Sequence, residues 1–257
     1  MLEFRIPEVG DKLLFEALLE PTDSAVKFVK LKGIGDDKII RIRGKKNRVA
    51  VGVPYCENLI RRLVEEGEDT PREIKKMSNE YDFHLVSLSC SFLPDPECNF
   101  AWARFGVELI ARSKAGTIHR EKPIAYDMFP EEILSKIGYK REISFTPRLK
   151  FNIGPVDVDA KPIDATTQKK YTIYEPQMFA FGVNTSKAMW DFKSTEEKGI
   201  WGNKRDLLLI ARTPKESNVK GRFILAAEVK SHLAKLIPVP IARKKDRIVD
   251  AEWNLSE

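Results

Sequence analysis

Regular alternation of apolar and polar side chains predicts β-strands through most of the chain. In residues 86–92, Val86, Leu88, Cys90 and Phe92 alternate with serines, which is the period of two of a strand with one buried face. Further apolar or alternating runs of strand length occur at 38–43, 49–53, 100–109, 149–153, 190–192, 207–210 and 223–227. Within 100–109 the apolar phase changes between positions 102 and 105, which predicts a β-bulge or a strand buried on both faces.

Short polar or proline-containing segments separate some of these runs and are typical of turns. Glycine and asparagine favour tight turns, and proline cannot donate a hydrogen bond to a strand ladder. We therefore expect three hairpins, which pair 38–43 with 49–53, 86–92 with 100–109, and 206–212 with 223–230.

Helical patterns are fewer than strand patterns. Residues 58–66 predict one short helix, Thr70 and Pro71 begin a second as its cap and first position, and residues 129–138 predict a third. Because strands outnumber helices and do not alternate with them one for one, we expect a mainly β fold, an antiparallel β-sandwich with a few short helical insertions.

The core of such a sandwich needs large side chains between its sheets. We assign to it Phe92, Phe100, Trp102, Phe105, Phe151, Trp190, Phe192, Trp201 and Phe223. The chain contains no linker of low complexity, so we expect a single β-rich unit over residues 1–257. A domain boundary, if the chain has one, is expected near 138–145, after the third expected helix.

The composition is that of a folded intracellular protein and limits its partners. Hydrophobic residues make up 42% and charged residues 32%, which is enough apolar surface to bury a core. The net charge of +6 permits contact with nucleic acid without requiring it. Three cysteines, no apolar leader and no apolar run of membrane length predict a cytoplasmic protein with no disulfide framework and no membrane partner.

Residues 204–230 carry the pattern with the clearest chemical meaning. Asp206 begins one apolar run, and Glu228 and Lys230 end the next. Because these last two residues are two positions apart, we expect them on the same face of their strand. The arrangement resembles the core of the PD-(D/E)xK nuclease superfamily, although Arg205 stands where that family has a proline. The resemblance implies that Asp206 and Glu228 bind Mg²⁺ or Mn²⁺ and that Lys230 positions the attacking water. The residues by themselves also fit the solvent-facing side of an amphipathic strand.

The first expected hairpin is strongly basic. Its cationic residues are Lys38, Arg41, Arg43, Lys45, Lys46 and Arg48. A basic β-ribbon can lie along a phosphate backbone, so these residues are candidates for nucleic-acid contact. Lysine and arginine also protect strand edges against association with other strands, and the segment has no aromatic residue for stacking. Both interpretations stay open.

Taken together, these patterns favour a non-enzymatic interaction module that needs no cofactor and binds a partner protein or nucleic acid. One alternative is a metal-dependent nuclease that uses Asp206, Glu228 and Lys230 with Mg²⁺ or Mn²⁺. A second is a structural subunit of a larger assembly, in which a partner covers the apolar runs 207–210 and 223–227. The sequence leaves the oligomeric state open.

Overall fold

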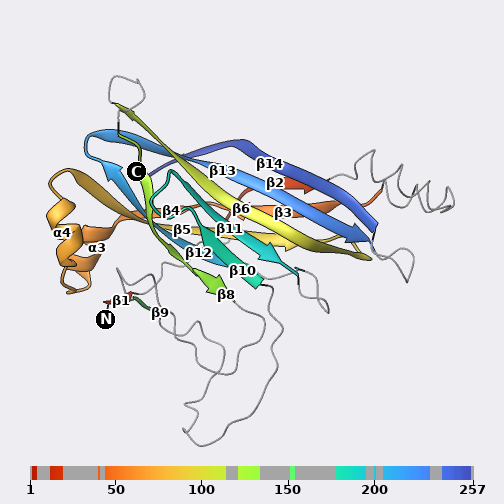
Figure 1. Cartoon of the computed structure of the whole chain (residues 1–257), viewed down its shortest axis with the longest axis horizontal. Helices are drawn as coiled ribbons and strands as arrows, with labels where there is room; N and C mark the ends of the chain where they lie inside the picture. The colour runs from red at the N-terminus through yellow and green to blue at the C-terminus, as the bar shows by residue number, and fades with distance from the viewer. Residues whose placement is uncertain are drawn as a thin grey trace, which may run out of the picture.

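Two antiparallel sheets lie face to face in the computed structural model of the chain (Figure 1). The structure describes residues 2–4, 12–19, 40, 44–113, 121–133, 151–153, 177–194, 200, 205–231 and 239–255. All described strand pairs within the two sheets are antiparallel. The mainly β, sandwich-like fold predicted from the alternation is confirmed.

Sheet I has the strand order β2-β3-β5-β12-β7, and β4 also pairs with β5. Its strands are β2 (Leu13–Leu19), β3 (Asn47–Gly52), β4 (Tyr55–Asn58), β5 (Tyr81–Leu93), β7 (Ile124–Phe129) and β12 (Arg205–Pro214). Sheet II has the order β14-β13-β6-β11-β10-β8. Its strands are β6 (Cys98–Ser113), β8 (Glu132–Ile133), β10 (Gln177–Phe181), β11 (Lys187–Lys193), β13 (Ser217–Ser231) and β14 (Val239–Asn254). A separate parallel pair joins β1 (Leu2–Phe4) to β9 (Phe151–Ile153).

The main core lies between the two sheets, where their inner faces meet. Phe92 of sheet I contacts Phe100 and Phe192 of sheet II, with ring centroids 5.4 and 5.0 Å apart. Phe15 and Phe223 make a second contact of this kind at 5.5 Å. Six of the aromatic residues assigned to the core are buried there: Phe92, Phe100, Phe105, Trp190, Phe192 and Phe223. Trp201 and the side chain of Phe151 lie outside the described part of the chain.

Two short helices cover part of the outer face of sheet I, at one end of the sandwich (Figure 1). α3 (Leu59–Glu65) begins at Asn58, whose side chain accepts a hydrogen bond from the Arg61 backbone N–H at 3.0 Å. α4 (Arg72–Met77) is capped by Pro71, one residue later than expected. Their apolar faces contribute to a second core cluster of Leu59, Leu63, Ile74, Phe83, Leu85, Tyr126, Leu208 and Ile210. Neither of these described helices is long and apolar enough to cross a membrane.

The third expected helix, over 129–138, is wrong in its described part, where β8 pairs with β10. The carbonyl groups of Pro130 and Glu131 would begin the hydrogen bonding of such a helix. They instead accept hydrogen bonds from the Trp190 indole N–H at 3.2 Å and from the Ala180 N–H at 2.8 Å. The rest of that segment, and the boundary expected near 138–145, lie outside the described residues.

Two of the three expected hairpins are instead links between the sheets. β5 belongs to sheet I and β6 to sheet II, and β12 and β13 are divided in the same way. Both edges of β5 are occupied by other strands, β3 and β12, and both edges of β13 are occupied by β6 and β14. Positive φ angles at Glu97 (66°) and Glu216 (60°) turn the backbone at the two links.

The remaining expected hairpin, which pairs 38–43 with 49–53, is also wrong. β3 has β2 on one edge and β5 on the other, so no edge is left for residues 38–43. Just before β3, the Gly44 N–H donates to the Ile40 carbonyl at 3.1 Å, and Ile40 has a helical conformation.

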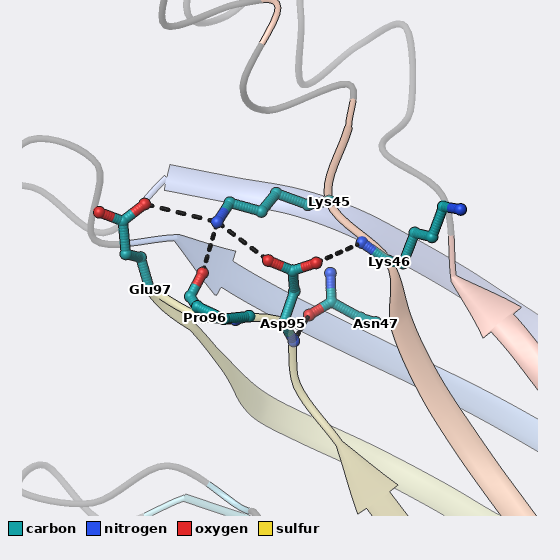
Figure 2. A network of polar contacts seen from close by, with 6 residues as sticks. All are labelled: Lys45, Lys46, Asn47, Asp95, Pro96 and Glu97. Atoms are coloured by element: carbon teal, nitrogen blue, oxygen red, sulfur yellow. Dashed lines mark hydrogen bonds and ion pairs between the residues drawn. The ribbon is translucent and has the colours of Figure 1, made fainter.

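Lys45 holds the β5–β6 link (residues 94–97) against the start of β3 (Figure 2). Its ammonium group lies 2.9 Å from Asp95 Oδ1 and 3.4 Å from Glu97 Oε2, and it donates to the Pro96 carbonyl at 2.5 Å. Only 11% of the Lys45 side chain is exposed, so water screens these contacts less than it screens a surface ion pair.

Backbone groups complete the same polar network. Asp95 Oδ2 accepts a hydrogen bond from the Lys46 N–H at 2.9 Å, and Asn47 Oδ1 accepts one from the Asp95 N–H at 3.0 Å (Figure 2). The Asp95 carbonyl in turn accepts a hydrogen bond from the Cys98 N–H, where β6 begins. Asp95 therefore connects the start of β3 in sheet I to the start of β6 in sheet II.

We predict that Asp95→Ala lowers the free energy of unfolding by about 1.5–3 kcal/mol, because it removes hydrogen bonds that involve a charged group. Urea unfolding of the two proteins measures the difference. Glu97→Ala is the matched control, since 45% of that side chain is exposed and its contact to Lys45 is longer. An equal loss in both variants would contradict a special role for Asp95.

The contribution of Asp95 should also depend on pH. Desolvation alone would raise the pKa of its carboxyl group, but the hydrogen bonds from Lys46 and Lys45 and the charge of Lys45 outweigh it and lower the pKa. A lowered folded-state pKa adds stability above the unfolded value of about 3.9, and this stability is lost as the pH falls through the folded value. The stability difference between the wild type and Asp95→Asn should therefore shrink below about pH 4. A constant difference across that range would contradict the assignment.

Candidate functional site

The structure separates the three residues of the nuclease-like pattern. Asp206 alternates along β12 with Leu207, which faces the main core, so Asp206 points outward from sheet I. Glu228 and Lys230 alternate along β13 with the core residue Val229, so both point outward from sheet II. The expectation that Glu228 and Lys230 share a face is confirmed, but the pairing of their strand with the Asp206 strand is wrong.

This arrangement bears directly on metal binding. Asp206 pairs with Ser89 in sheet I, whereas Glu228 pairs with Trp102 in sheet II. Packed sheets lie about 10 Å apart, and these two carboxylates point away from each other across that layer. Magnesium–oxygen bonds are about 2.1 Å long, so one ion cannot bind both groups. Within the described residues, no three or more His, Cys, Asp and Glu side chains come together as metal ligands.

The basic candidates at 38–48 divide into three groups. Lys38, Arg41 and Arg43 lie outside the described residues. The Lys45 ammonium group is engaged at the β5–β6 link, which makes it a structural residue. The Lys46 side chain is exposed and points away from that network (Figure 2), and Arg48 forms a 3.3 Å ion pair with Glu16.

The apolar runs 207–210 and 223–227 are covered within the chain itself. Leu207 and Leu209 lie in the main core, and Leu208 and Ile210 pack in the second cluster beside the helices. All five residues of 223–227 are at most 5% exposed. No partner is needed to cover either run.

A β-bulge in β6 turns Trp102 out of the core. In the pairing with β13, Phe100 lies opposite Val229 and Trp102 lies opposite Glu228, so Ala101 is the additional residue. Phe100 and Phe105 both face the core, whereas Trp102 lies half-buried on the outer face of sheet II. The predicted bulge is confirmed, at a position slightly earlier than expected. The assignment of Trp102 to the core is wrong.

Trp102 belongs to a cluster on the outer face of sheet II. Arg104, two residues further along β6, lies over the rings of Trp102 and Phe181, with 5.3 and 5.0 Å between Cζ and the ring centroids. Its Nε and one terminal nitrogen donate to the two carboxylate oxygens of Asp191, at 2.7 and 2.9 Å. On the neighbouring strands, the Lys193 ammonium group lies 5.5 Å from the centroid of Phe179. We call Trp102, Arg104, Phe179, Phe181, Asp191 and Lys193 the aromatic–cation cluster.

Strand register brings the cluster together. Arg104 lies opposite Asp191, Asp191 lies opposite Phe179, and Trp102 lies opposite Lys193. β6, β11 and β10 each contribute two outward residues spaced two apart. The result is a flat face that presents aromatic rings and cations side by side.

The outer face of sheet II carries an excess of positive charge among its described residues. Its cations are Arg104, Arg112, Lys187, Lys193, Lys220, Arg222 and Lys230, and its anions are Glu108, Glu132, Asp191 and Glu228. The Glu108 carboxylate forms ion pairs with the Arg222 guanidinium group at 2.9 Å and with the Lys187 ammonium group at 3.6 Å. Among these described residues, seven positive groups against four negative groups favour an anionic partner.

The sequence matches no known protein-family model and no curated protein. The assignment of a site therefore depends on the geometry of the chain itself.

Sequence reasoning did not identify the aromatic–cation cluster. The available signal was a set of pairs spaced two apart on strands, such as Trp102 with Arg104 and Asp191 with Lys193. Nothing in the sequence indicated which of these strands are neighbours, and the bulge at Ala101 reverses the face on which Trp102 lies.

We predict that Mg²⁺ or Mn²⁺ changes the thermal unfolding midpoint equally in the wild type, Asp206→Ala and Glu228→Ala. A ligand that binds the folded state raises the midpoint, and a shared site would lose this effect in both variants. Differential scanning fluorimetry across a metal titration measures it. Metal stabilisation that disappears in both variants would show that the two carboxylates act together.

Proposed function

We propose that this protein is an interaction module that binds single-stranded nucleic acid on the outer face of sheet II. The aromatic–cation cluster is the observation that carries the proposal. Bases in a single strand expose their ring faces, and proteins bind them by stacking them on aromatic side chains displayed on a sheet. Surrounding lysine and arginine side chains neutralise the phosphates.

The shape of the face favours a single strand over a duplex. The cluster comes from three neighbouring strands, β6, β11 and β10, whose outward side chains lie next to one another. A duplex is read by an element that enters a groove, whereas its base faces are stacked on one another and closed to aromatic side chains. Half-buried rings such as Trp102, Phe179 and Phe181 suit unpaired bases.

The charge of the face favours nucleic acid over a protein partner. Tryptophan and arginine are also common in the hot spots of protein interfaces. The excess of cations, however, extends beyond the cluster to Arg112, Lys220 and Lys230, along the length of β6 and β13. A polyanion would use this whole row of charges.

We predict that Trp102→Ala and Phe179→Ala each weaken binding of a fluorescently labelled single-stranded oligonucleotide. The expected loss is about 1–3 kcal/mol, or roughly 5- to 150-fold in Kd, because one stacked base is lost in each case. Fluorescence anisotropy titrations at fixed salt measure it.

Tyr55→Ala is the matched control, because this aromatic residue is 40% exposed but lies on β4 of sheet I. Its affinity should equal that of the wild type. If the wild type binds no oligonucleotide, the proposal fails and the outer face becomes a candidate surface for a protein partner. If all three variants weaken binding equally, binding does not depend on this face.

A further inference from the structure

Asp191 and Arg104 form the most tightly matched ion pair in the aromatic–cation cluster. The two residues face each other across β11 and β6, and both carboxylate oxygens accept hydrogen bonds from the same guanidinium group. Paired bonds of this kind fix the orientation of the guanidinium plane as well as its position. The Arg104 and Asp191 side chains are 22% and 16% exposed, respectively, so the pair is largely shielded from water.

The pairing affects the rings on either side. The guanidinium group lies over both Trp102 and Phe181, so Asp191 also fixes where the guanidinium group lies relative to the two rings. A guanidinium plane can itself stack in the manner of an aromatic ring. Trp102, Arg104 and Phe181 therefore form one group of neighbouring side chains whose guanidinium is anchored by Asp191.

The charge of Arg104 is meanwhile compensated by Asp191. Lys193 differs in this respect, because its side chain is exposed and its nearby ring carries no charge. The two cations of the cluster therefore differ, because the charge of Arg104 is compensated by a bidentate ion pair and Lys193 lies beside an uncharged ring.

We infer that Asp191 is a positioning residue that makes Arg104 part of the stacking surface and withholds it from phosphate contact. This inference depends on the proposed function and assigns separate roles within the same face. Lys193 contacts phosphate, whereas Arg104 contributes through its position between the two rings.

The dependence of affinity on salt separates these roles, since each phosphate contact contributes about −0.7 to the slope of log K against log salt for single strands. Asp191→Asn releases Arg104 and should make the slope more negative by about 0.7. Lys193→Met should make it less negative by a similar amount. The double variant Arg104→Met with Asp191→Asn should keep the wild-type slope while it binds more weakly.

Glu228→Gln is the matched control for charge. Glu228 lies on the same face, directly opposite Trp102, and its substitution removes one negative charge without releasing Arg104. Its slope should stay near that of the wild type. An equal change in Glu228→Gln and Asp191→Asn would overturn the inference, because the effect would then be one of net charge. A slope that becomes less negative in the double variant would also overturn it, since Arg104 would already contact phosphate.

A heparin column tests the same inference without nucleic acid. Asp191→Asn should elute at higher salt than both the wild type and Glu228→Gln, because only this variant releases a further cation. Co-elution of the two variants would overturn the role of Asp191 even if the wild type binds no oligonucleotide. Failure of oligonucleotide binding alone, with the expected heparin result, would overturn the proposed function and leave the positioning role standing.

Discussion

The structure depends on one requirement, which is that the inner faces of two sheets be buried against each other at the same time. Phe92 shows how this is met, because it contacts Phe100 and Phe192 of the opposite sheet. The chain crosses from sheet I to sheet II directly after β5, which places Phe92 and Phe100 on facing sheets. The β5–β6 link makes that crossing, and Asp95 and Lys45 hold it in place with largely buried polar contacts. The division into two sheets also decides which side chains of each strand face the core and which face outward.

The alternation of side chains predicted β3, β5, β6, β9, β11, β12 and β13 and most of the core, because the period of two is a local property of the sequence. Strand pairing is not local. The expected hairpins failed because β3, β5 and β13 each find both partners elsewhere in the chain. Nor does a phase change show where a bulge lies. The additional residue at Ala101 moved Trp102 from the expected core to the outer face. The third expected helix does not form over its described residues, 129–133, because tertiary hydrogen bonds occupy the carbonyl groups of Pro130 and Glu131.

The same contrast applies to candidate sites. The run of cations in the sequence made Lys45 a candidate for nucleic-acid contact, but its ammonium group contacts Asp95 and Pro96 of the β5–β6 link. The nuclease-like pattern assumed a pairing between two apolar strands that in fact belong to opposite sheets. The aromatic–cation cluster is assembled by register alone, from pairs of residues that are unremarkable on their separate strands. It combines what stacking requires, aromatic rings that are only half-buried, with what a polyanion requires, an excess of positive charge, on one outer face of the sandwich.

The central claim is that single-stranded nucleic acid contacts the outer face of sheet II. Nuclear magnetic resonance of the tryptophan indole N–H groups tests it most directly, because Trp102 lies on that face and Trp190 lies in the core. Addition of a single-stranded oligonucleotide to the wild-type protein should shift the Trp102 indole signal, assigned by comparison with Trp102→Phe, and leave that of Trp190 in place. If the oligonucleotide binds and other signals move while that of Trp102 stays unchanged, the ligand lies on another surface and the account is wrong.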